Sequence, residues 1–288
     1  MHDSKTASIE KPLPPRSSSC MKSIRFHALV GLWRIVPLMV GCHFPPLAFP
    51  AHVQCEARSS VNRVTVLELY TSEGCNSCPP ADRWLSSLPA RGLTSDRLIP
   101  LAFHVDYWDQ LGWPDRMAKE QFSMRQRTQS QRNGNTVVYT PQLLLNGLDY
   151  RIDSRIEQRI NKLNGLPADA ELLVRQRQTS AGLELEIDAR VMRKHEHPVQ
   201  TFIAITEDGL ESAIKAGENQ GKLLHHDFVV RELWKPIAKD SLGDVHWRSA
   251  PMLPAEWKRA DLSLVVFVQN QRTGEVLQAL KTPLCVSK

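Results

Sequence analysis

The residues best suited to chemistry are two cysteines, Cys75 and Cys78, which follow directly after an apolar segment at residues 64–70. Thiols at C-x-x-C spacing can close a small reversible disulfide, and the start of a helix favours a thiolate because its free N–H groups and dipole are positive there. We therefore predict Cys75 as the nucleophile and Cys78 as the resolving thiol. This role requires Cys75 to be open to a partner.

Two other interpretations of the cysteine pair stay open. C-x-x-C forms half of many zinc sites, but structural zinc needs four ligands and the sequence contains no second C-x-x-C or C-x-x-H. The pair can also be an ordinary structural disulfide. Of the remaining cysteines, Cys55 and Cys285 either pair with each other or stay free, and the spacing does not decide between these.

Residues 1–57 are predicted to be a signal or targeting segment with a disordered lead. A basic start at residues 21–25, an apolar run at 28–40 and small residues near Ala48 and Ala51 are typical of a secretory signal peptide. The apolar run is short for a membrane span. We therefore expect a periplasmic or otherwise extracytoplasmic location, with membrane contact only through the signal peptide or a lipid on Cys42.

The charge distribution argues against a nucleic-acid partner. The net charge is +5, and most of it lies in residues 1–58, which hold seven Lys or Arg against three Asp or Glu. The nearly neutral remainder lacks the basic footprint of a nucleic-acid-binding protein. Outside the cytosol disulfides persist, which suits the cysteine content.

Apolar spacing and turn residues predict two domains. In residues 58–167 we expect strands at 64–70 and 98–107, helices at 81–88 and 115–131, a strand entered through Thr140-Pro141, an Asn-Gly hairpin and a last helix near 156–163. A strand, helix, strand order implies a parallel crossover and an α/β fold. In residues 168–288 we expect an antiparallel β-sandwich with strands at 171–178, 183–192, 199–207, 223–234, 262–270 and 276–281.

The order of elements in residues 61–165 resembles the thioredoxin fold. The motifs TSEGCNSCPPAD, FHVDYWDQLGW, YTPQLLLNG and GENQGKLLHHDFVVR resemble a bacterial family of exported thioredoxin-like proteins of unknown function, the DUF1223 family. This resemblance implies a thiol–disulfide oxidoreductase-like protein that acts on a thiol- or disulfide-bearing protein or a small thiol. It implies no cofactor, and it leaves open whether the protein is an enzyme.

The resemblance also assigns residues around the dithiol. Pro141, preceded by Thr140, matches the cis-proline position, where the backbone can pair with an extended substrate. Glu68 resembles the buried acid that moves the resolving thiol's proton, although one extra residue precedes Cys75. The alternative for Glu68 is an edge-facing side chain paired with a basic residue. Trp108 and Trp113 are candidates for substrate contact or for packing.

The alternative interpretations of the site concern its histidines. His104 and Asp106 share one face of a strand, where His104 would join Cys75 and Cys78 as a copper ligand in a metallochaperone, or form a hydrogen-bonded pair with the aspartate. His225 and His226 should point to opposite faces and serve the structure. A third class is a non-catalytic envelope binding protein in which the Cys75–Cys78 bond is structural.

Overall fold

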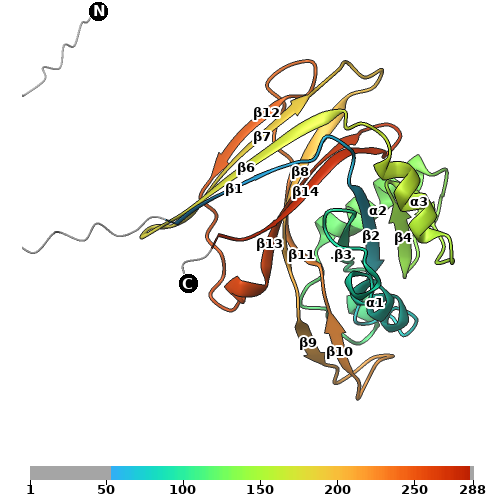
Figure 1. Ribbon diagram of the computed structural model, residues 1–288. Helices are drawn as coiled ribbons and strands as arrows, with labels where there is room; N and C mark the ends of the chain where they lie inside the picture. The colour runs from blue at the N-terminus through green and yellow to red at the C-terminus, as the bar shows by residue number, and fades with distance from the viewer. Residues whose placement is uncertain (1–52, 286–288) are drawn as a thin grey trace, which may run out of the picture. The chain divides into compact units, whose positions relative to one another are not determined.

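Strands make up most of the regular secondary structure in residues 53–285, the part of the chain that this computed structural model describes (Figure 1). The elements in chain order are β1 Val53–Arg58, β2 Thr65–Thr71, α1 Pro79–Ser86, β3 Leu98–His104, α2 Glu120–Arg132, β4 Gln142–Leu145, β5 Leu148–Tyr150, α3 Ile156–Asn164, β6 Ala170–Thr179, β7 Gly182–Val191, β8 Val199–Glu207, β9 Leu210–Ala213, β10 Leu223–His226, β11 Val229–Trp234, β12 Val245–Ser249, β13 Leu262–Asn270 and β14 Val276–Pro283. The expected signal segment and Cys42 lie outside the described residues. Within 53–285, no helix has the length and apolar character to cross a membrane.

One mixed sheet of eight strands organises the molecule. Its order is β14-β13-β8-β11-β3-β2-β4-β5. β2 and β3 run parallel, as the crossover predicts, and β11 joins β3 in parallel through the pair Val229 and Ala102. The chain on both sides of the expected boundary at residues 167 and 168 therefore contributes strands to this sheet.

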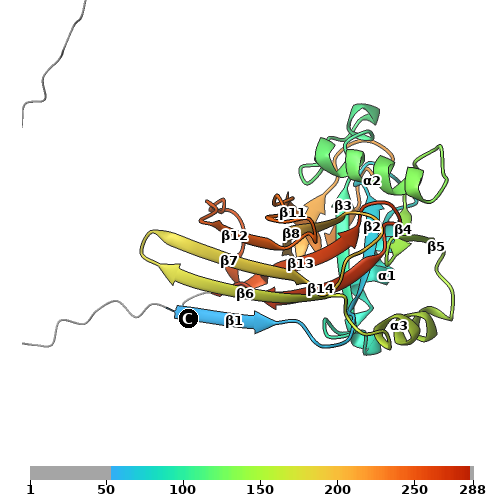
Figure 2. The ribbon, with the colours of Figure 1, turned by 90° about the horizontal axis from the view of Figure 1, so that it is seen from above.

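The helices divide between the two faces of the sheet because side chains alternate along each strand. Leu67 and Leu69 of β2 pack against α1 and α3, where Leu85 and Ile160 are buried. The opposite face of β2 packs against Phe122 of α2. Figure 2 shows α2 on one side of the sheet and α1 and α3 on the other.

A second, antiparallel sheet in the order β1-β6-β7-β12 covers the part of the large sheet formed by β8 and β13. Alternate residues of its strands, such as Val174 and Ile187, pack on Ile203 and Val266. The predicted antiparallel strands are present, and two sheets packed face to face enclose this part of the core.

Three expectations about the strands were wrong. Residues 53–57, expected in the disordered lead, form most of β1 and pair with β6. The single strand expected at 223–234 is interrupted at Asp227 and Phe228, where Phe228 has a φ of 59°. Short strands β9 and β12 were not expected, because four or five residues carry little periodicity.

A buried arginine on α2 joins elements from both parts of the chain. The Arg125 guanidinium donates two hydrogen bonds of 2.8 Å to Glu68 on β2 and one of 3.2 Å to Gln269 on β13. Its carbon lies 4.5 Å from the ring centroid of Phe202 and 5.3 Å from that of Phe267. The ion pair is therefore enclosed by aromatic rings rather than by water.

A disulfide between Cys55 and Cys285 connects β1 to the segment after β14 across a sequence separation of 230 residues. The question that the spacing left open is thus answered in favour of pairing. Because the bond links two distant positions, it restricts the unfolded chain over almost the whole described length.

We predict that Arg125→Leu lowers the free energy of unfolding by about 3–5 kcal/mol, because the Glu68 carboxylate would stay buried without its partner. Urea denaturation would measure the loss. Arg127→Leu, an exposed position on the same helix, should change it by less than about 0.5 kcal/mol. Glu68→Leu combined with Arg125→Leu should cost less than the two single changes added together, and strictly additive losses would contradict the pairing.

We predict that replacing both Cys55 and Cys285 with serine lowers the free energy of unfolding by about 2–5 kcal/mol, since the unfolded chain gains freedom. Denaturation of the oxidised wild type and the double variant provides the comparison. Equal stabilities would show that the link does not constrain the unfolded state.

Candidate dithiol site

The Cys75–Cys78 disulfide lies where β2 leads into α1. A turn closes after the strand, with the Cys75 amide donating to the Ser72 carbonyl. Cys78 is the N-cap residue of α1, and two prolines occupy the first turn, where the missing N–H groups cost nothing. α1 therefore begins two residues before the expected start at residue 81, and the disulfide lies at its N-terminal end.

Both cysteines are fully buried, with 0 % of each residue exposed. Only Asn76 and Ser77, the two residues between them, reach the surface. The expectation that Cys75 is open to a partner was wrong. It rested on the chain around the C-x-x-C motif alone, whereas the cover comes from residues far along the sequence.

The loop at residues 214–222 between β9 and β10, called the cover loop below, lies on the turn that carries the cysteines. The Asn219 side-chain amide donates to the carbonyls of Glu73 and Cys75, at 2.8 and 2.9 Å. The Glu218 carboxylate accepts the amide N–H of Asn76 at 3.1 Å. These contacts hold the loop on the backbone that carries the disulfide.

Sequence reasoning missed the cover loop as part of the site. The run GENQGK was noticed only as a family motif, and its glycines and polar residues are typical of any surface turn. Asn219 is completely buried although its side chain is polar, but this feature is visible only in the folded chain.

The two predicted tryptophans and the predicted cis proline have definite positions in the structure. The indole of Trp108 donates to the Thr140 hydroxyl at 2.8 Å, and the indole of Trp113 donates to Glu73 at 2.7 Å. The Thr140–Pro141 peptide bond is cis, as predicted. Both tryptophan N–H groups thus bind within the protein, as the packing alternative predicts.

The role predicted for Glu68 is contradicted. Glu68 points to the α2 face of the sheet, where it binds Arg125 and accepts a 2.7 Å hydrogen bond from Tyr70. Its neighbours Leu67 and Leu69 point to the α1 face instead. The extra residue before Cys75 is the physical reason, since a shift of one position along a strand exchanges the faces.

A buried cluster of five titratable side chains lies beside the disulfide, and we call it the polar cluster: Glu73, Asp82, His104, Asp115 and His226. His104 Nδ1 is 2.6 Å from Asp115 Oδ2, so the predicted His–Asp pair forms with Asp115 and not with Asp106. His226 Nε2 is 3.5 Å from Glu73 Oε1, and its Nδ1 is 3.9 Å from Asp82 Oδ2. The two imidazoles meet edge to face at 4.9 Å.

Charge and burial set the protonation of this cluster. Burial raises the pKa of Asp82, against the opposing effect of His226 and His104. Burial also disfavours the charged form of Asp115, yet the His104 charge outweighs it and lowers the pKa of Asp115 to about 2. The pKa of His104 is raised because Asp115 outweighs the effect of burial, and that of Glu73 is lowered because its hydrogen bond to His226 does the same.

The histidines of β10 point to opposite faces, as predicted. His226 is buried in the polar cluster, whereas His225 is exposed beside Glu211. His226 therefore belongs to the dithiol site although it comes from the β-rich part of the chain. The sequence placed it in a strand but gave no sign of which residues it would meet.

Metal-ligating side chains do not converge on the cysteines. In residues 53–285, one group of three such residues has ligand atoms within 4.8 Å of one another: Glu186, Asp188 and His246. Arg175 already pairs with both of these carboxylates. The copper set of Cys75, Cys78 and His104 stays a prediction.

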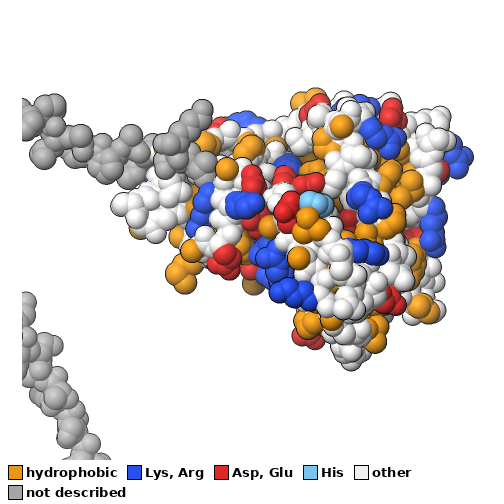
Figure 3. All heavy atoms as spheres, turned by 90° about the horizontal axis from the view of Figure 1, so that it is seen from below, with side chains coloured by type: hydrophobic (Ala, Val, Ile, Leu, Met, Phe, Trp, Pro, Cys, Tyr) orange, Lys and Arg blue, Asp and Glu red, His pale blue; other side chains and the backbone are white. Residues whose placement is uncertain are grey.

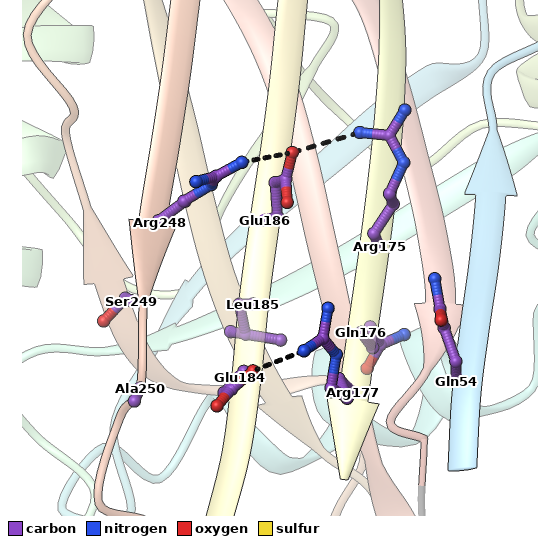
Figure 4. Close-up of a pocket in the computed structure, with 10 residues that line it drawn as sticks. All are labelled: Gln54, Arg175, Gln176, Arg177, Glu184, Leu185, Glu186, Arg248, Ser249 and Ala250. Atoms are coloured by element: carbon purple, nitrogen blue, oxygen red, sulfur yellow. Dashed lines mark hydrogen bonds and ion pairs between the residues drawn. The ribbon is translucent and has the colours of Figure 1, made fainter. Parts of the chain in front are cut away.

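The cavity drawn in Figure 4 also lies away from the cysteines. It has a volume of about 510 Å³ and is lined by residues of β1, β6, β7 and β12, among which Arg175 and Arg248 both pair with Glu186 and Arg177 pairs with Glu184. The three arginines of the lining thus face two glutamates, which leaves a net charge of +1. Acidic and basic side chains are similarly interspersed on the face shown in Figure 3.

Comparisons with known proteins place the fold and the family. The crystal structure of protein AGR_C_4864 from Agrobacterium tumefaciens is similar, with 24% identity, a TM-score of 0.52, and coverage of 80% of this chain and 98% of that one. HBP35 of Porphyromonas gingivalis is similar at 16% identity and a TM-score of 0.59, over 78% of this chain and 76% of that one. At these identities both concern the fold alone.

No curated protein matches the sequence significantly. A family model matches residues 66–269, a range that includes the disulfide, the polar cluster and the cover loop. The chain therefore belongs to the family described as "Protein of unknown function (DUF1223)".

Proposed function

We propose that this protein is an exported thiol–disulfide oxidoreductase-like protein that exchanges its Cys75–Cys78 bond with a thiol- or disulfide-bearing protein or a small thiol. The observation that carries the proposal is a disulfide at a helix N-terminus, held under one loop by a few hydrogen bonds. Such a position stabilises the thiolate that exchange requires. The signal-like segment in residues 1–57 supports a location outside the cytosol.

The order of elements supports a thioredoxin-like interpretation of residues 58–167. β2, α1 and β3 form a parallel crossover, α2 follows, and β4 and β5 form an antiparallel hairpin before α3. In that fold the dithiol lies at the start of the first helix after the central strand, which is where Cys75 and Cys78 lie. The β-rich part supplies the cover.

The exchange can be written with balanced electrons and protons. A partner thiolate attacks the Cys75 sulfur, the Cys75–Cys78 bond breaks, and Cys78 leaves as a thiolate that takes up a proton. A second partner thiol then loses its proton and attacks the partner sulfur bound to Cys75, which releases Cys75. The protein gains two electrons and two protons, and the partner dithiol becomes a disulfide. The reverse sequence reduces a partner.

The cover loop must move before either direction can proceed. Asn76 and Ser77 are exposed between the cysteines and provide the first contact for a partner. Asn219 makes two of the hydrogen bonds that hold the loop on this segment. At about 0.5–1.5 kcal/mol each, they set the population of the open form.

We predict that Asn219→Ala speeds reduction of the Cys75–Cys78 bond by dithiothreitol about tenfold, because two such bonds are removed. Mass spectrometry of the alkylated peptide that contains Cys75 would follow the reaction. Gln220→Ala, an exposed position in the same loop, is the matched control and should react at the wild-type rate. Equal rates for the wild type, Asn219→Ala and Gln220→Ala would show that the cover loop does not limit access to the disulfide.

We predict that the protein accelerates reduction of insulin by dithiothreitol and that Cys75→Ser abolishes this acceleration. Serine cannot form the mixed disulfide on which exchange depends. Precipitation of the insulin B chain reports the rate. Cys285→Ser should keep the acceleration, since this cysteine lies in the other disulfide. Indistinguishable rates for the wild type and Cys75→Ser would end the oxidoreductase proposal.

A second candidate is a non-catalytic envelope binding protein with a structural Cys75–Cys78 disulfide. The complete burial of both sulfurs is the observation that favours it. It expects no acceleration of insulin reduction. It also expects the Cys75–Cys78 bond to resist dithiothreitol in the folded protein, with or without Asn219.

A further inference from the structure

We propose that Asp82, assisted by His226, takes the proton of the Cys78 thiol when Cys78 resolves a mixed disulfide on Cys75. This inference rests on the proposed exchange function and names the groups that move its proton. It gives to two residues of the polar cluster the role that the sequence suggested for Glu68.

Helix geometry places Asp82 beside Cys78. Cys78 has helical backbone angles, and its carbonyl accepts the amide N–H of Asp82 at 3.1 Å. Side chains four residues apart on a helix lie on the same face with about 5–6 Å between their Cβ atoms. Because Cys78 is 0 % and Asp82 only 6 % exposed, this shared face is turned into the protein.

His226 reaches the same carboxylate from β10. Its ring is 2 % exposed and stands between two acids, with Nδ1 3.9 Å from Asp82 and Nε2 3.5 Å from Glu73. Apart from its close contact with Glu73, neither ring nitrogen has a hydrogen-bond partner within residues 53–285. A buried imidazole with free nitrogens next to a carboxylate has the capacity to pass a proton onward.

Of the remaining members of the polar cluster, His104 and Asp115 bind each other, and Glu73 accepts the indole N–H of Trp113. Asp115 binds His104 and also accepts the backbone amides of Glu73 and Met117, so its role is to fix the turn before the cysteines. Burial raises the pKa of Asp82 toward the range in which an acid exchanges protons at neutral pH. Asp82 is therefore the carboxyl of the cluster suited to accept and return a proton.

The step balances in atoms and charge. The Cys78 S–H proton moves to the Asp82 carboxylate, and the Cys78 sulfur attacks the Cys75 sulfur of the mixed disulfide. The Cys75–Cys78 bond forms while the bond between Cys75 and the partner sulfur breaks. The partner leaves as a thiolate, and Asp82 passes its proton through His226 when the cover loop opens.

Ellman's reagent separates this step from the first attack. When the reduced protein reacts with the reagent, Cys75 releases one thionitrobenzoate, and attack by Cys78 on the mixed disulfide releases the second. Stopped-flow absorbance records both phases. A background in which Cys20, Cys42, Cys55 and Cys285 are all replaced with serine leaves only the dithiol to react.

Asp82→Asn should leave the first phase unchanged and slow the second about tenfold or more, and His226→Gln should slow it in the same direction. Glu120→Gln, an exposed carboxyl on α2, should change neither phase. Circular dichroism and thermal unfolding check that each variant is folded, and His226→Gln carries the test should Asp82→Asn fail to fold.

The pH profile distinguishes proton transfer from a structural effect. In Asp82→Asn the second phase should rise steeply with pH, because hydroxide must remove the proton, whereas the wild type should be flatter. Asp82 faces His104, Asp115 and His226, and Glu73 contacts the other nitrogen of His226. All of these groups stay in the variant, so the difference between the pH profiles belongs to Asp82.

The outcomes separate this inference from the proposed function. Two normal phases with unchanged pH dependence in both variants would overturn the role of Asp82 and His226 while exchange stands. Absence of the first phase in the reduced wild type would overturn dithiol exchange itself, and the inference with it.

Discussion

The buried ion pair between Arg125 and Glu68 is the interaction on which the rest of the structure depends. Two charges with almost no contact with water are stable only while each retains its partner, so the pair fixes α2 against β2. The same guanidinium binds Gln269 and lies over Phe202, which come from the β-rich part. One side chain thereby holds the two parts of the chain in register within a single sheet.

This register brings the cover loop and His226 to the cysteines. β11 pairs with β3, and β10 and the cover loop precede β11 in the chain, so their positions at the helix N-terminus follow from the strand order. The dithiol site is thus composite: the sulfurs come from one part, and the cover and one imidazole come from the other. The surroundings of this disulfide therefore depend on contacts outside the C-x-x-C motif.

Local patterns predicted what depends on neighbours in sequence. The start of α1 after Cys78, the parallel crossover and the strands of the β-rich part follow from periodicity and from proline placement. Local patterns do not predict three other features: the pairing of Glu68 with Arg125, the burial of Cys75 and the position of His226 in the polar cluster. Each of these brings together residues that are tens of positions apart. The misassignment of Glu68 shows the limit most clearly, since a one-residue offset sent it to the other face of β2.

The positions of the cysteines bear on the order in which the two disulfides are able to form. A polypeptide emerges from the ribosome N-terminus first, so this bond cannot close until residue 285 has appeared, whereas Cys75 and Cys78 come out almost together. The C-x-x-C pair is therefore complete before β10, β11 and the cover loop have been synthesised. The short ring is able to close before these elements enclose it, whereas the longer link has to wait for almost the whole chain.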